Sequence, residues 1–146
     1  MPFPRSTDKG NTALALAPLA SAQALRQQAT LYKTPQCGCC EDYASYLRDH
    51  GFKVGVIATH ELDAIRAKHA VPESLGGCHT TLVGGYVVEG HVPVGAIRKL
   101  LADKPRIRGI SLPGMPQGSP GMTGRKEAPF RVMTFGGGES KTYWVE

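Results

Sequence analysis

Three of the chain's four cysteines lie within four consecutive positions, at Cys37, Cys39 and Cys40. The fourth, Cys78, is followed directly by His79. Deprotonated cysteines are both the nucleophiles of thiol–disulfide exchange and the preferred ligands of soft metal ions. The cluster therefore predicts thiolate chemistry, either electron transfer between thiols or the binding of a soft metal.

The spacing of Cys37 and Cys40 is the C-x-x-C spacing of thiol–disulfide oxidoreductases. If the chain is a redox enzyme, these two cysteines are its catalytic pair. Cys39 fits this interpretation poorly, because a third thiol invites scrambled disulfide pairing. It fits a metal site better, since an additional thiolate can bridge two soft ions.

Two other uses of four cysteines stay open at this point. A pair of stabilising disulfides would join Cys78 to one of the other three cysteines. A chain of this length can build a hydrophobic core and does not need such staples. An iron–sulfur site would also take four thiolates, but three cysteines within four positions leave little room for a cubane cluster.

The elements that must position these residues follow from hydrophobic periodicity and turn signals. The patterns predict an α/β fold with the thioredoxin-like order β-α-β-α-β-β-α. The predicted strands cover residues 29–33, 52–57, 80–83 and 86–89, and the predicted helices cover 41–50, 61–69 and 93–101. The segment 37–40 then lies in the loop and first turn of the first helix, where a helix N-terminus stabilises a thiolate.

This strand order brings distant residues to one edge of the sheet. The third predicted strand runs antiparallel to the first, so Cys78 and His79 should face the cysteine segment. The Gly84-Gly85 turn predicts a hairpin, which should return His91 to the same edge. A thioredoxin has a substrate-guiding proline at the start of the third strand, whereas this chain has two metal-ligand residue types there.

A methionine-bearing loop adds a second kind of sulfur ligand. Pro-Gly-Met occurs twice, ending at Met115 and at Met122. Thioether, thiolate and imidazole together select Cu(I), whereas zinc rarely uses methionine. The alternative is that both methionines pack the loop against apolar surface.

The Pro/Gly/Met-rich segment, 111–122, should be neither helix nor central strand. Residues 130–135 and 141–145 should form a C-terminal β-hairpin.

Composition restricts the classes of partner. The 146 residues carry a formal net charge of +5, with scattered basic pairs that favour a solvated surface over a nucleic-acid groove. No apolar run is long enough for stable insertion in a membrane.

Residues 1–24 have the order of a secretory signal peptide, with Ala22 and Ala24 at the cleavage site. The alternative is a disordered leader on a cytoplasmic protein; in both cases residues 25–146 form a single domain.

Several separated motifs together resemble the CopG copper-resistance proteins, from about Leu31 to Met122 and more loosely in the C-terminal hairpin. The motifs are residues 34–40, 78–80, 85–86, 89–93 and 113–122. The resemblance implies a periplasmic protein that binds a cysteine-bridged cluster of more than one copper ion, with a copper-linked oxidoreductase role and periplasmic copper-handling proteins as partners. Carried over by matching positions, the ligands are Cys37, Cys39, Cys40 and Cys78, with His79, His91, Met115 and Met122 as nearby or peripheral ligands.

Overall fold

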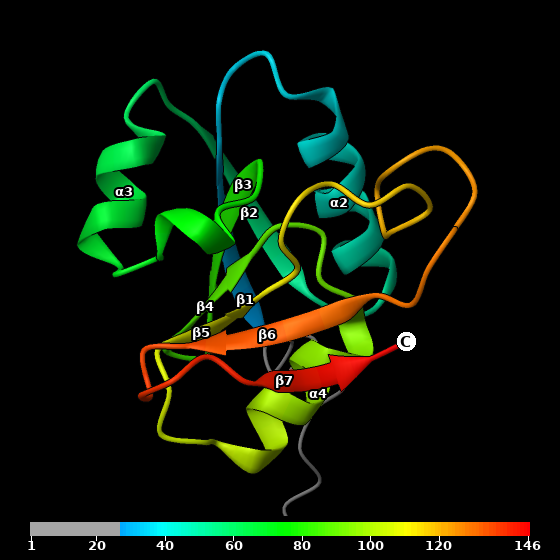
Figure 1. Ribbon diagram of the computed structural model, residues 1–146. Helices are drawn as coiled ribbons and strands as arrows, with labels where there is room; N and C mark the ends of the chain where they lie inside the picture. Colours follow the sequence, from blue (N-terminus) through cyan, green and yellow to red (C-terminus); the bar gives the residue numbers. More distant parts are fainter. Residues whose placement is uncertain (1–26) are drawn as a thin grey trace, which may run out of the picture.

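A seven-stranded mixed sheet forms the centre of the protein in the computed structural model, which describes residues 27–146 (Figure 1). The strands lie in the spatial order β2-β1-β3-β4-β5-β6-β7. They are β1 Gln28–Lys33, β2 Lys53–Ala58, β3 His79–Val83, β4 Tyr86–Glu89, β5 Gly109–Ser111, β6 Arg131–Phe135 and β7 Thr142–Val145. The helices are α2 Gly38–Asp49, α3 Leu62–Lys68, α4 Val94–Asp103 and the 3-10 turn η1 Glu73–Leu75. The predicted leader, residues 1–24, lies outside the described residues.

The first four strands and the helices follow one another as β-α-β-α-β-β-α, which confirms the predicted order and the α/β class. β1 and β2 pair in parallel, β3 pairs antiparallel with β1, and β4 pairs antiparallel with β3. In Figure 1, α2 and α3 lie on either side of β1 and β3. The thioredoxin-like assignment itself stays a prediction.

The strand register brings the expected residues to one edge of the sheet. Lys33, the last residue of β1, lies opposite His79, the first residue of β3. Thr80 lies opposite Glu89, the last residue of β4. The hairpin between β3 and β4 turns at Gly84 and Gly85, whose φ angles of 58° and 82° suit a tight two-residue turn. Cys78 therefore lies beside the start of α2, and the segment after β4 returns to the same place.

The sequence analysis missed one short strand. The segment 111–122 was expected to be neither helix nor central strand, which holds from Leu112 onward, but its first residue ends β5, Gly109–Ser111, inside the sheet. β5 is parallel to β4 and antiparallel to β6, so the C-terminal hairpin extends the main sheet. The strand is too short to show a periodic pattern. A side chain at Gly109 would collide with the backbone of Val87, so close packing selects a residue that normally weakens a strand.

Helix α2 presents the cysteine segment because its inner face is firmly packed. Tyr43, Ala44 and Leu47 are buried against the sheet, as the helical spacing predicts. Cys37 precedes the first turn and makes no side-chain cap, so the first backbone N–H groups of α2 remain directed at the cysteine region. Among residues 27–146, none of the helices combines the length and apolar character that crossing a membrane requires.

Candidate metal centre

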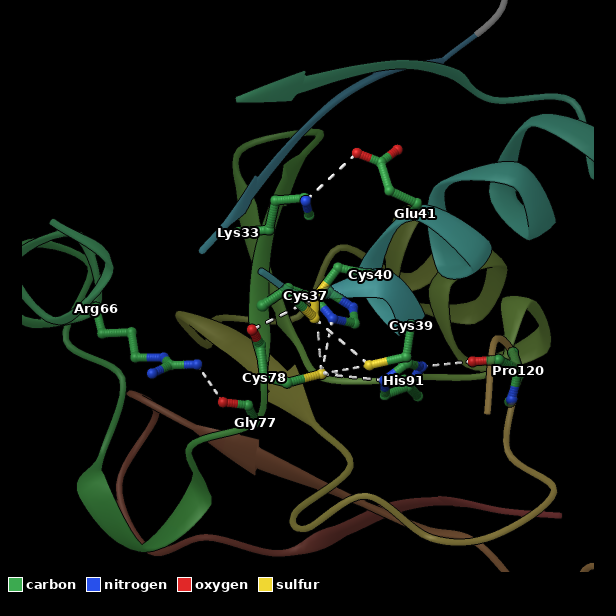
Figure 2. The surroundings of a disulfide bond; sticks show 11 residues. Lys33, Cys37, Cys39, Cys40, Glu41, Arg66, Gly77, Cys78, His91 and Pro120 are labelled. Carbon is green, nitrogen blue, oxygen red and sulfur yellow. Dashed lines mark hydrogen bonds and ion pairs between the residues drawn. A yellow bond between two sulfur atoms is a disulfide. The ribbon is translucent and has the colours of Figure 1, made fainter. Parts of the chain in front are cut away.

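The four cysteines gather where α2 begins and β3 begins (Figure 2). Cys37 and Cys40 are joined by a disulfide, with Cα atoms 5.5 Å apart. Cys39 and Cys78 are free thiols, each half-buried. The alternative of two stabilising disulfides is therefore wrong for this structure, because Cys78 pairs with none of the other three cysteines.

The sulfur atoms are close enough to share metal ions. All four Sγ atoms lie within 4.8 Å of one another. Sγ of Cys78 lies 3.8 Å from Sγ of Cys39 and 3.9 Å from Sγ of Cys40, and Sγ of Cys39 lies 3.4 Å from Sγ of Cys37. The structure thus brings together all four predicted cysteine ligands, and reduction of the disulfide would release two more thiols into the group.

Two imidazoles approach Cys78 from the other side. Sγ of Cys78 lies 3.2 Å from Nδ1 of His79 and 3.1 Å from Nε2 of His91. Nδ1 of His91 is 2.6 Å from the carbonyl oxygen of Pro120, which can only accept a hydrogen bond. This contact assigns the proton of a neutral ring to Nδ1 and leaves the Nε2 lone pair directed at the thiol. Cys78, His79 and His91 therefore form a second potential ligand group that shares its cysteine with the first.

The histidines are buried and held in the neutral form that metals require. Neither ring is exposed to solvent. Burial, and then the proximity of His91, lowers the pKa of His79 to about 3. Burial also lowers the pKa of His91, partly opposed by its hydrogen bond to Pro120. Nε2 of His79 is buried without a hydrogen-bond partner among the described residues, which is an unusual condition for an imidazole outside a functional site.

Cys78 is a protonated thiol in the metal-free protein. Burial, followed by the proximity of Cys39, raises its pKa to about 12. A thiol with this pKa is a poor nucleophile at neutral pH. A bound metal ion lowers this pKa, because its positive charge stabilises the thiolate and the thiol proton is released. The donor set, two free thiols and two neutral imidazoles, is chemically suited to a soft cation.

The structure places the two loop methionines differently. Met115 is 53% exposed and lines a hollow of about 210 Å³ together with Cys78. The rest of this lining is glycine, so no charged group borders the hollow. Met122 is half-buried and does not line that hollow. Met115 thus shares a hollow with one of the thiols, and the role of both methionines as ligands stays a prediction.

Comparison with solved structures decides the family. The chain is similar to two structures titled "Copper resistance protein copG", Form 2 and Form 1, with 34% sequence identity to each. The similarity covers 82% of this chain and 98% and 96% of the two structures, with TM-scores of 0.76 and 0.75. The chain belongs to the CopG copper-resistance family. The resemblance found in the sequence motifs is therefore confirmed.

The CopG assignment agrees with one further comparison. Residues 75–122 match the family described as "Protein of unknown function, DUF411". This match spans Cys78, both histidines and both loop methionines, but not the segment that holds the other three cysteines. A search of curated proteins finds no match.

The sequence analysis of this CopG-family chain missed the polar residues that surround the centre. Glu89 is fully buried and is paired with Arg66 and Thr80. Lys33 is only 5% exposed, and its Nζ lies 3.4 Å from Oε1 of Glu41 (Figure 2). The sequence did contain a signal for them, because Lys33 and Glu89 are charged residues at the ends of largely apolar strands. Charged side chains in such positions are rarely buried without a partner.

Proposed function

We propose that the chain binds Cu(I) for copper resistance or homeostasis, at a centre built on Cys37, Cys39, Cys40 and Cys78. The single observation that carries this proposal is the position of the Cys78 sulfur, which belongs both to a group of four cysteines and to a group with two imidazoles. Thiolate and imidazole ligands of this kind select soft transition ions. The family resemblance supports copper as the particular ion, since both similar structures are titled copper resistance proteins.

We propose that the reduced centre holds more than one Cu(I). Four thiolates exceed the two or three donors that one Cu(I) needs, and sulfurs within 4.8 Å of one another can bridge neighbouring ions. The disulfide form offers fewer donors, namely Cys39, Cys78 and the two histidines. Reduction of the disulfide with two electrons and two protons gives the thiols of Cys37 and Cys40, which complete the set.

Anaerobic titration tests the copper proposal directly. The dithiothreitol-reduced full chain, freed of reductant, is titrated with Cu(I) against a colorimetric chelator and the complexes are weighed by native mass spectrometry. We expect more than one ion per reduced chain, and fewer ions when the Cys37–Cys40 disulfide is left intact. A plateau at one ion or none in the reduced protein would overturn the cluster.

We further propose that the protein acts in the periplasm and exchanges copper with other copper-handling proteins there. The support is the order of residues 1–24, in which basic residues precede a short apolar stretch and Ala22 and Ala24 follow. Cell fractionation of a C-terminally tagged chain tests this, together with the intact mass of the exported product. Cleavage after Ala24 leaves 122 of the 146 residues. Full-length protein confined to the cytoplasm would refute it.

A second function has its own supporting observation. The Cys37–Cys40 disulfide lies at the N-terminus of α2, where backbone N–H groups stabilise the thiolate that forms on reduction. This arrangement suits a thiol–disulfide oxidoreductase, with or without a copper-linked step. Catalysed reduction of insulin disulfides by dithiothreitol tests it in the metal-free protein. A rate no faster than that of dithiothreitol alone would exclude this activity.

A further inference from the structure

Glu89, the last residue of β4, forms a buried ion pair two residues before His91 in the chain. Its side chain has no exposure to solvent, and Nε of Arg66 donates to its Oε1 at 2.9 Å. The hydroxyl of Thr80 lies 2.8 and 2.9 Å from the two carboxylate oxygens. Burying a carboxylate is costly, and well-packed apolar residues would often serve stability as well or better. The pair therefore calls for a role other than stability alone.

Arg66 also reaches the segment that carries Cys78. Its Nη2 donates to the carbonyl oxygen of Gly77, the residue immediately before Cys78 (Figure 2). The guanidinium thus joins three elements: α3, the end of β4 and the loop that enters β3. Nη1 of Arg66 also lies 3.6 Å from Oδ1 of Asp63. The Asp63 side chain is fully exposed to solvent, so this ion pair contributes little to stability.

The two segments that Arg66 joins are in direct backbone contact. A Cβ atom on Gly77 would lie 2.7 Å from the Cα atom of Gly90, so no side chain fits between them. The amide of Gly90 donates to the carbonyl of His79 at 3.1 Å. Cys78 follows Gly77 and His91 follows Gly90, so any shift between these glycines changes the separation of the thiol and the imidazole.

We propose that Arg66 is the positioning residue of the centre, holding Gly77 and Glu89 at once so that Cys78 and His91 meet. The forked guanidinium makes this possible, because its nitrogens lie in one rigid plane and bind two acceptors in a fixed geometry. Lysine, with a single ammonium, cannot reproduce that spacing. For copper binding this inference rests on the proposed function, but the arrangement of Cys78 can be tested without metal.

The first test measures the arrangement in the metal-free full chain with its disulfide intact. Iodoacetamide alkylates the two free thiols, and peptide mass spectrometry gives the rate at Cys78 relative to Cys39 in the same molecule. We expect Arg66→Ala to raise this ratio roughly tenfold, because the loop before Cys78 opens more often. Arg66→Lys should keep the fold and still show a raised ratio. Arg48→Ala is the matched control. Arg48 also donates to a backbone carbonyl, that of Val54 at a distance of 2.9 Å, but it does not contact the cysteine segment.

The second test measures copper in the same variants. We expect the Cu(I) affinity of the reduced Arg66→Ala protein to fall about 10-fold to 100-fold, the range typical of residues that orient metal ligands. The copper–thiolate absorption should change as well, which a loss of stability alone would not produce. If Arg66→Ala does not fold, Arg66→Lys and Glu89→Gln provide both measurements.

The outcomes separate the two proposals. An alkylation ratio in the Arg66 variants equal to that of wild type and Arg48→Ala overturns the positioning role, even if copper binds normally. A raised ratio in the Arg66 variants, together with a reduced wild-type chain that binds no copper, supports the positioning role and refutes the proposed function. A raised ratio with weakened copper binding supports both.

Discussion

Nε2 of His91 lies 3.1 Å from Sγ of Cys78, while Nδ1 of the same ring lies 2.6 Å from the carbonyl oxygen of Pro120. Nδ1 therefore anchors the ring to the Pro/Gly/Met-rich loop that contains Pro120, and Nε2 faces the thiol. A ligand oriented in this way loses little freedom when it binds a metal. The Pro/Gly/Met-rich loop is thus connected to the centre through its backbone as well as through Met115.

Cys39 should matter for metal loading and not for thiol–disulfide exchange. We expect Cys39→Ser to lower copper capacity by at least one ion per reduced chain, because it removes a free thiol that lies between Cys37 and Cys78. Insulin-reduction activity, where present, should persist because the Cys37–Cys40 pair is intact. Cys40→Ser should impair both properties. Loss of insulin reduction with unchanged copper stoichiometry in Cys39→Ser would favour the enzyme over the copper site.

The two loop methionines should differ in their effect on copper. Met115→Leu removes the thioether at nearly constant volume from the hollow that Cys78 lines, so we expect Cu(I) affinity to fall about tenfold. Met122→Leu is the matched control and should change affinity little, since Met122 does not line that hollow. Competition with a Cu(I) chelator measures both variants. Equal effects of the two substitutions would contradict this distinction.

The docking of the loop on α2 depends on Gly121. Its φ angle is 81°, and a Cβ atom there would lie 2.8 Å from the backbone nitrogen of Tyr43. We expect Gly121→Ala to destabilise the protein by roughly 3 kcal/mol or more, combining backbone strain with overpacking. The measurement is urea unfolding of the metal-free chain.

Gly114→Ala is the matched control for this effect on stability. Gly114 has a similar φ angle of 75°, but a Cβ atom there meets nothing within 4 Å. This variant should show only the backbone strain, about 1–2 kcal/mol. If the two alanine variants unfold at the same urea concentration, the close approach of Gly121 to α2 does not contribute to stability.

Copper binding should strengthen as pH rises. The pKa of Cys78 is raised to about 12, so the thiol is protonated at neutral pH and must release its proton to bind Cu(I). Each displaced proton increases the apparent affinity about tenfold per pH unit below the pKa. Titrations between about pH 6 and pH 9, with the chelator calibrated at each pH, measure this slope. The slope counts the protons released when copper binds, so Cys78→Ser should lower it by about one. A pH-independent affinity of the wild-type chain would show that Cys78 is not a ligand.

Local patterns in the sequence determined most of the framework. The periodicity of residues 29–101 predicted the order of strands and helices, and Gly84-Gly85 predicted the hairpin that returns His91. These features depend on neighbouring residues, so they are visible in the sequence. The placement of Cys78 and His79 near the start of α2 was predicted from the antiparallel direction of the third strand, and the register agrees, because Lys33 at the end of β1 lies opposite His79.

Only the tertiary structure decided the features that depend on contacts between distant segments. The central position of β5 requires Gly109 to fit closely against Val87, which a three-residue strand cannot signal by its own pattern. The pairing of Cys37 with Cys40, and the link from Arg66 to both Gly77 and Glu89, depend on separations of a few ångströms. Composition and spacing identified which chemical groups the cysteine cluster contains. Packing determined which of those groups meet, because hydrogen bonds and sulfur contacts are sensitive to distances that periodicity does not specify.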